Sequence, residues 1–271
     1  IAFDLDHTVI NSDGTMSDAT RTVIEQAIAE GIEIVPVSGR AFATFPESIG
    51  QIKGISYAVT SNGAAIYNKK TGERIHGVAI EYADLHSILD AFADYFQNGQ
   101  ITYEAFVDGV AYGGREYVEH PEAFGVPERN VAYVQSTRKP VDDIIAFLSE
   151  HEEELDSLDI VAADTALYQK IEEQIPLVTK SVYTTSAVSY RLEISHKNSG
   201  KATGLAYVLK LLDITPEETV AFGDGDNDAE MLEFAGLGVA MENATENCKA
   251  AADIVCDCCK NDGVARFLYG F

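Results

Sequence analysis

The stretch Ile1-Ala-Phe-Asp-Leu-Asp-His-Thr8 opens the chain with an apolar run that ends in acids. The apolar residues predict a short buried strand, and in open parallel sheets ligands bind beyond the carboxyl ends of the strands. Asp4 and Asp6 therefore fall where such a fold carries its chemistry. Two close carboxylates repel each other, and both stay ionised only beside a cation. We expect a bound metal ion here; the alternative is that the acids only cap a turn or a helix.

A second acidic group is Gly223-Asp224-Gly225-Asp226-Asn227-Asp228, which follows an apolar strand expected over residues 219–222 and precedes a helix expected over 229–234. Oxygen ligands at a small site suit Mg²⁺, which uses one or two carboxylates and also takes phosphate oxygens. A calcium-binding EF-hand loop would need a glutamate at a spacing that this segment lacks. The sequence also has no Gly-x-Gly-x-x-Gly motif, which disfavours a dinucleotide-binding fold.

Polar residues follow two further predicted strands. Val37-Ser38-Gly39-Arg40 and Ser61-Asn62-Gly63 supply hydroxyl, amide and backbone donors of the kind that hold a phosphate, although each alone could be an ordinary turn. Lys201 precedes a helix expected over residues 203–212 and could balance the acids and a developing phosphoryl charge. Lys197 is the competing candidate for that role, and we expect it to be a solvated loop residue.

Short apolar runs alternate with amphipathic segments along the chain, which predicts the α/β class. We expect a Rossmann-like parallel-sheet core built from residues 1–81 and 189–271, with an α+β domain inserted at residues 82–188. Residues 190–194 are expected to return to the main sheet as a strand.

The composition of the 271 residues is that of a folded globular protein, with 46% hydrophobic and 23% charged residues. The net charge of −25 makes nucleic acids and anionic membranes poor partners. No apolar run approaches the roughly 18 residues of a membrane span, and the acidic start lacks the basic segment of a signal peptide. We therefore expect a cytoplasmic protein. Because residue 1 is not methionine and already reads as strand, we expect a few native residues to precede it.

The four cysteines, Cys248, Cys256, Cys258 and Cys259, crowd the C-terminal end of the chain. Without an export signal, reduced structural thiols are expected rather than a disulfide framework. A zinc site is the alternative, but neither a neighbouring histidine nor a second cysteine pair completes it.

Taken in order, four motifs resemble those of the haloacid dehalogenase superfamily. They are Asp4-Leu5-Asp6-His7-Thr8, Ser38-Gly39-Arg40, Lys201 and Gly223-Asp224-Gly225-Asp226-Asn227-Asp228, with a long insertion between the second and the third. More narrowly, the chain resembles the Cof-like phosphatases. This resemblance implies that residues 82–188 form a substrate-selecting cap and that the remainder forms the catalytic core. His7 departs from the family pattern, which most often has glycine there, but it leaves both carboxylates intact.

The resemblance also implies a role for each acid. Asp4 would attack phosphorus to form an aspartyl-phosphate, while Asp6 would protonate the leaving oxygen and then take a proton from water. Lys201 would be the third catalytic residue. The implied Mg²⁺ ligands are Asp4, Asp6 through its backbone carbonyl, and Asp224, with Asp228 anchoring the metal's waters or Lys201. The implied phosphate-binding residues are Ser38, Gly39, Arg40, Asn62 and Asn227.

The function implied by the resemblance is a Mg²⁺-dependent phosphatase that hydrolyses small phosphorylated metabolites, with sugar phosphates favoured. One alternative is a phosphomutase of the same fold, which would pass the phosphoryl group to a second hydroxyl. Another is a non-enzymatic phospho-acceptor or metabolite-binding protein. Four polar residues of the middle region are candidate contacts to a sugar: Tyr112, Arg115, Tyr183 and Arg191.

Overall fold

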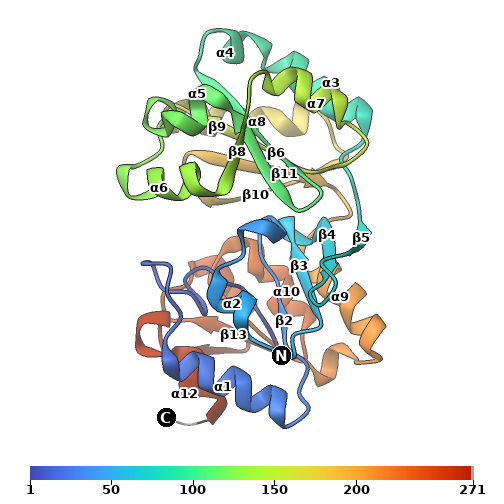
Figure 1. The fold of residues 1–271 in the computed structure, drawn as a ribbon, viewed down its shortest axis with the longest axis vertical. Helices are drawn as coiled ribbons and strands as arrows, with labels where there is room; N and C mark the ends of the chain where they lie inside the picture. Colours follow the sequence, from blue (N-terminus) through green and yellow to red (C-terminus); the bar gives the residue numbers. More distant parts are fainter. Residues whose placement is uncertain (270–271) are drawn as a thin grey trace. The chain divides into compact units, whose positions relative to one another are not determined.

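The computed structural model describes residues 1–269, which form two compact units (Figure 1). Unit 1 comprises Ile1–His76 and Gly200–Phe271, and unit 2 comprises Gly77–Ser199. The expected α/β class is confirmed, because a parallel sheet forms the core of unit 1 and the chain between its two halves folds as an insertion. Among the residues described, no helix is both long and apolar enough to cross a membrane.

The central sheet of unit 1 has five strands, and all its pairings are parallel. The first strand lies between its neighbours with Ala2 opposite Ala221 on one side and Val35 on the other. In sheet order the strands are β14 (Ile254–Cys256), β13 (Leu237–Met241), β12 (Val220–Gly223), β1 (Ala2–Phe3) and β2 (Val35–Pro36). The carboxyl ends of these strands therefore lie along one edge of the sheet, as predicted from the sequence.

Helices on the sheet complete the core of unit 1. The N-cap of α1 (Asp18–Ala29) is Ser17, whose Oγ accepts the backbone N–H of Thr20 at 3.0 Å. Helix α9 (Lys201–Leu212) buries Leu205 and Val208 in the same apolar cluster as Phe3 and Phe222. The remaining helices are α2 (Glu47–Gln51), α10 (Ala229–Phe234), α11 (Glu246–Ala251) and α12 (Gly263–Tyr269).

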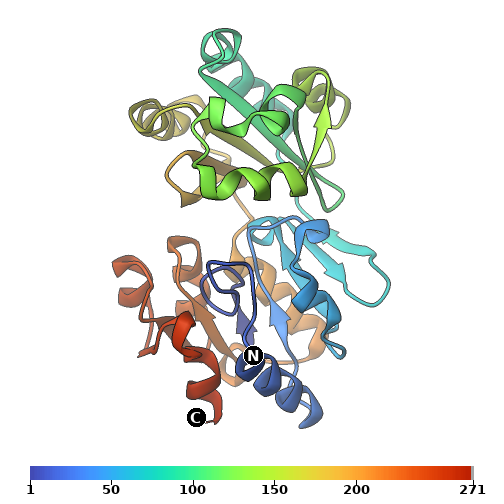
Figure 2. The same ribbon diagram turned by 60° about the vertical axis from the view of Figure 1, so that its left-hand side comes forward.

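A second, three-stranded sheet of unit 1 continues from the edge at β2. It contains β3 (Tyr57–Thr60), β4 (Ala65–Asn68) and β5 (Arg74–Gly77), in that order, and Figure 2 shows it in light blue and cyan. A single parallel bridge between Val37 and Val59 connects it to the central sheet. The loop after β3 therefore reaches the same edge as the loops after β1 and β2.

Unit 2 is built on a six-stranded sheet in which only the β7–β8 pair is parallel. In sheet order the strands are β10 (Val182–Val188), β11 (Arg191–His196), β9 (Leu155–Ala162), β6 (Ile101–Val107), β7 (Val110–Gly114) and β8 (Arg138–Val141). Four helices pack apolar side chains against one face: α3 (Tyr82–Ala91), α4 (Ala93–Gln97), α7 (Ile144–Glu150) and α8 (Thr165–Val178). Helices α5 (Arg115–Glu119) and α6 (Glu128–Thr137) cover part of the other face.

The expectation that residues 190–194 return to the main sheet is wrong. Residues 191–194 form most of β11, which pairs antiparallel with β9 and β10 inside unit 2. The physical reason is visible in the alternation of Leu192 and Ile194 with charged residues, which is typical of an antiparallel strand with one apolar face. The inserted unit accordingly runs from Gly77 to Ser199, wider than the expected 82–188.

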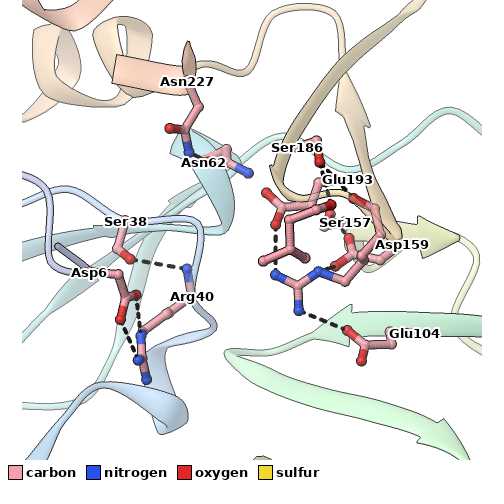
Figure 3. Close-up of polar contacts among 12 residues, drawn as sticks. Asp6, Ser38, Arg40, Asn62, Glu104, Ser157, Asp159, Ser186, Glu193 and Asn227 are labelled. Atoms are coloured by element: carbon pink, nitrogen blue, oxygen red, sulfur yellow. Dashed lines mark hydrogen bonds and ion pairs between the residues drawn. The ribbon is translucent and has the colours of Figure 1, made fainter. Parts of the chain in front are cut away.

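The second face of the unit 2 sheet carries a row of buried acidic side chains. Glu104, Asp159 and Glu193 lie directly opposite one another on three adjacent strands (Figure 3). Like charges in that position repel. Arg191 approaches all three acids at 3.6, 3.4 and 2.8 Å, and Arg138 makes a two-point contact with Glu104 at 2.8 and 2.9 Å. The positive charges of the two arginines offset the repulsion among the acids.

Replacing Glu104 by glutamine should destabilise unit 2 in a pH-dependent way. Burial raises the pKa of Glu104, but Arg138 and Arg191 outweigh burial and hold it below its usual value. A carboxyl with a depressed pKa contributes stability above its unfolded pKa and loses that stability as the pH falls through its folded pKa. We expect Glu104→Gln to lower the free energy of unfolding by about 3 kcal/mol at pH 7, and the difference from wild type to shrink in acid.

Asp159→Asn is the matched control for this measurement. Burial raises the pKa of Asp159 well above its usual value, so its neutral form is favoured and asparagine resembles that form. We expect a change below about 1 kcal/mol in urea unfolding. Equal losses in the two variants, or a Glu104→Gln loss that persists unchanged at low pH, would contradict this account.

Candidate active site

The site forms where β1 and β12 end side by side. Phe3 pairs with Phe222, so the loops that follow the two strands start next to each other. The backbone N–H of Asp4 donates to the carbonyl of Phe222 at 2.9 Å. The first acidic group and the second, more than 200 residues apart in sequence, therefore meet at the carboxyl edge of the parallel sheet.

Lys201, the first residue of α9, lies buried between two of the acids. Its Nζ donates to Asp4 Oδ1 and to Asp228 Oδ1, at 2.6 Å in each case, and the residue is 2% exposed. Burial lowers the pKa of Lys201, but the charges of Asp228 and Asp4 outweigh burial and raise it above its usual value. The ammonium is thus held charged. Lys197 is exposed in unit 2, where its Nζ lies 3.5 Å from Ser181 Oγ.

The acids outnumber this one cation. Asp4, Asp224 and Asp228 each offer a carboxylate oxygen, and these oxygens lie within 4.8 Å of one another. Burial and then the neighbouring Asp228 raise the pKa of Asp224 to about 7. Burial also raises the pKa of Asp4 well above its usual value, even though Lys201 acts in the opposite direction. A divalent cation would relieve this repulsion, and hard carboxylate oxygens are the donors that Mg²⁺ prefers. The three residues fit such an ion.

The carboxylate of Asp6 is not one of these three converging acids, and it is paired with Arg40. Arg40 Nε donates to Oδ2 and Nη2 donates to Oδ1, both at 2.7 Å (Figure 3). Arg40 Nη1 also donates to the carbonyl of Thr44 at 2.9 Å. Burial raises the pKa of Asp6, but the hydrogen bonds and charge of Arg40 outweigh burial and lower it. The Mg²⁺ contact predicted for Asp6 is its backbone carbonyl, which takes no part in this ion pair. Arg40, predicted to bind phosphate, contacts Asp6 in this structure.

The other predicted phosphate-binding residues lie on neighbouring loops. Ser38 is buried at the end of β2, and its Oγ accepts the backbone N–H of Arg40 at 3.2 Å across Gly39. The side chains of Asn62 and Asn227 point toward each other, and Asn227 Nδ2 donates to Asn62 Oδ1 at 3.0 Å (Figure 3). Backbone hydrogen bonds connect the loop after β2 with the loop after β3, because Asn62 N–H donates to the carbonyl of Ser38 at 3.1 Å.

Two residues that orient Asp224 received no role from the sequence. Thr8 Oγ donates to Asp224 Oδ1 at 2.9 Å. Asn243 Nδ2 donates to the carbonyl of His7 at 3.0 Å and lies 3.5 Å from Asp224 Oδ2. The position of Asn243 could have identified it as a site residue, because it belongs to a polar run directly after β13, a third strand of the same parallel sheet.

The backbone at His7 explains why glycine is frequent at this position of the motif. His7 has a φ of +62°, in the left-handed region where side chains other than glycine are strained. The turn is held by the N–H of His7, which donates to the carbonyl of Ile10 at 2.7 Å. His7 therefore keeps the turn that the motif requires, at a conformational cost of about 1 kcal/mol.

All four cysteines are free thiols, as expected. Cys248 and Cys259 are buried in the core cluster of unit 1. Cys258 lies near Glu242 and Asp257, but no histidine joins them in the part of the chain that the structure describes.

Comparison with known proteins agrees with this geometry. Residues 1–268 match the haloacid dehalogenase-like hydrolase family. The chain is 31% identical over 292 residues to phosphatase YwpJ of Bacillus subtilis strain 168, and the alignment covers 99% of this chain and 98% of the relative. It is 28% identical over 271 residues to the 5-amino-6-(5-phospho-D-ribitylamino)uracil phosphatase YitU of the same organism, with 99% and 95% covered. A solved haloacid dehalogenase-like hydrolase from B. subtilis has a TM-score of 0.81 at 26% identity over 98% of each chain.

These likenesses extend over the whole molecule. The family match spans both units, so it includes the insertion as well as the loops that carry the acids. The relatives in turn are covered almost from end to end. The chain therefore belongs to the haloacid dehalogenase-like hydrolases, within which it is a Cof-like phosphatase.

Proposed function

We propose that this phosphatase hydrolyses phosphate monoesters of small metabolites through an aspartyl-phosphate formed on Asp4, with Mg²⁺ as its cofactor. The observation that carries the proposal is the buried contact of Asp4 with Lys201, beside Asp224 and Asp228. A structural ion pair would need one acid for one lysine. Three converging acids around one buried lysine instead supply a nucleophile together with ligands for a divalent ion.

The chemistry divides between two carboxyl groups. A carboxylate oxygen of Asp4 attacks phosphorus, the bond from phosphorus to the substrate oxygen breaks, and Asp6 gives its proton to that oxygen. Water then attacks phosphorus and loses a proton to Asp6. The bond between phosphorus and Asp4 breaks, which releases inorganic phosphate and restores both carboxyl groups.

The metal would be held by Asp4, the backbone carbonyl of Asp6 and Asp224, with Asp228 anchoring Lys201. When bound, Mg²⁺ supplies positive charge that neutralises the phosphoryl oxygens. Lys201 adds a fixed positive charge, and its contact with Asp4 at 2.6 Å orients that carboxylate for attack. The hydroxyl of Ser38, the N–H of Gly39 and the amide of Asn227 are the proposed donors to the transferred phosphoryl oxygens.

Arg40 controls the proton on Asp6 in this scheme. The two-point ion pair keeps Asp6 ionised, so Asp6 must leave Arg40 and take up a proton before it acts as an acid. We therefore propose that Arg40 holds Asp6 in its ionised form before the substrate binds, whether or not Arg40 also contacts the substrate.

Unit 2 is the proposed substrate-selecting domain. YitU acts on 5-amino-6-(5-phospho-D-ribitylamino)uracil, and this relative supports phosphorylated sugars or sugar alcohols as the substrate class. Three of the four candidate sugar contacts already have partners within the protein. Arg115 is exposed and pairs with Asp142 at 2.7 Å, and Tyr112 packs on Phe147. Arg191 contacts the row of buried acids in the unit 2 sheet. A phosphomutase activity remains the alternative, and it would show as transfer of phosphate to a second hydroxyl instead of its release.

Asp4→Asn should abolish phosphate release from p-nitrophenyl phosphate. The amide is a far weaker nucleophile than the carboxylate, so we expect a loss of at least about 10³-fold in kcat. Asp90→Asn, on the exposed face of α3, is the matched control and should keep full activity. Folding is checked by thermal unfolding. Substantial turnover by folded Asp4→Asn would refute the assignment of the nucleophile.

Removing divalent ions should lower phosphate release by at least about 100-fold, and added Mg²⁺ should restore it. A second measurement is independent of activity: Mg²⁺ should raise the Tm of the wild type, because a ligand bound only by the folded state stabilises it. Asp224→Asn should lose this shift and Asp90→Asn should keep it. An unchanged rate after exhaustive chelation would remove the metal from the proposal.

Arg40→Gln should change the pH dependence of kcat/KM. The acid role of Asp6 needs its protonated form, so the rate falls as the pH rises through the pKa of Asp6. Arg40 lowers that pKa, and its removal should move the falling limb to higher pH by about one unit. Arg21→Gln, on the surface of α1, is the control and should leave the profile unchanged. A limb that moves to lower pH would contradict the role given to Arg40.

A further inference from the structure

Asn62 contacts three of the loops that form the site. Its N–H donates to the carbonyl of Ser38 at 3.1 Å, on the loop after β2. Its carbonyl accepts the N–H of Gly200 at 2.8 Å, one residue before Lys201. Its side-chain Oδ1 accepts Nδ2 of Asn227 at 3.0 Å, on the second acidic loop. Each contact uses a different group of the same residue.

The backbone around Asn62 is in an unusual conformation. Ser61, Asn62 and Gly63 form a short turn, η2 (Ser61–Gly63), with φ values of +49°, +51° and +88°. Residues other than glycine in this region cost about 1–3 kcal/mol and persist only where the surroundings over-determine them. Asparagine tolerates the left-handed region better than most residues, which fits its place at the centre of the turn.

Close packing against α9 explains why the turn has this shape. A Cβ added to Gly63 would lie 2.0 Å from the carbonyl oxygen of Gly200, and one added to Gly204 would lie 2.5 Å from Val59 Cγ1. Backbone therefore contacts backbone where the turn meets the start of α9. The position of Lys201 is set by this contact as well as by its own helix.

The Asn227 amide depends on the same turn. Asn227 is 8% exposed, and a buried amide without a partner would cost about 1–3 kcal/mol. Asn62 Oδ1 satisfies it and fixes its direction. Asn62 itself is 3% exposed, so the pair is formed in a buried setting where the geometry is rigid.

We infer that Asn62 is a positioning residue of the phosphoryl site, which holds Asn227 and the start of α9 in place, and that it does not itself bind the phosphate. The inference rests on the proposed function and refines it, because the sequence had placed Asn62 among the direct phosphate contacts. It predicts that the side chain of Asn62 acts through Asn227.

A double-mutant cycle on phosphate binding tests this inference. Inorganic phosphate in the presence of Mg²⁺ is titrated calorimetrically into wild type, Asn62→Gly, Asn227→Ala and the double variant. Glycine keeps the left-handed backbone and removes only the side chain. We expect each single variant to weaken binding by about tenfold, the value of one hydrogen bond to a charged group. The double variant should bind no more weakly than Asn227→Ala.

The outcomes separate the two roles of Asn62. A direct phosphate contact would make Asn62→Gly weaken binding further, by a similar factor, in the Asn227→Ala background, and this result would overturn the inference. Absence of any effect of Asn62→Gly, or of phosphate binding by the wild type, would overturn it as well. Asp213→Gly is the matched control, since Asp213 is exposed with a φ of +55° at the far end of α9 and should not affect binding.

The proposed function can fail separately from this inference. The binding cycle does not depend on turnover, whereas the aspartyl-phosphate is tested by Asp4→Asn. Loss of coupling between Asn62 and Asn227 with normal phosphate release would remove only the positioning role. Normal coupling with an active Asp4→Asn variant would remove only the nucleophile.

Discussion

The contact of Lys201 with Asp4 and Asp228 is the interaction on which the rest of the site depends. It joins the start of α9 to the loops after β1 and β12, and it is buried from solvent. Breaking one partner of a buried ion pair leaves an uncompensated charge, at a cost of about 3–5 kcal/mol. The three loops can therefore carry so many acids only while the lysine stays in place, and the fold supplies several backbone contacts that keep it there.

Local charge, and not the charge of the whole chain, determines what the site can bind. The chain carries a net charge of −25, which repels a phosphate dianion at long range. Salt screens that repulsion beyond about 10 Å, so the nearby cations decide the outcome. Lys201 alone does not balance Asp4, Asp224 and Asp228. A divalent ion would neutralise the remaining negative charge, which makes metal and substrate interdependent in the proposed function.

The sequence predicted the parts of the site that follow from one topological rule. Asp4, Ser38, Asn62 and Asp224 each come within two residues of the end of a strand, and parallel strands end at a common edge, so their meeting was predictable. The pairings between individual side chains could not be predicted, because nothing in the spacing of Asp6 and Arg40 along the sequence indicates their two-point contact. Strand β11 was misassigned for a similar reason. A five-residue strand fits either sheet until its alternation of apolar and charged residues is used to choose between parallel and antiparallel neighbours.

The turn at Ser61–Gly63 also contacts the residue at which the chain re-enters unit 1. The chain returns from unit 2 at Gly200, one residue before Lys201. The N–H of Gly200 is bound to the carbonyl of Asn62, and the missing Cβ of Gly63 lets the two backbones touch. The strained turn thus fixes the start of α9, and with it Lys201, and its conformational cost is a consequence of this close contact.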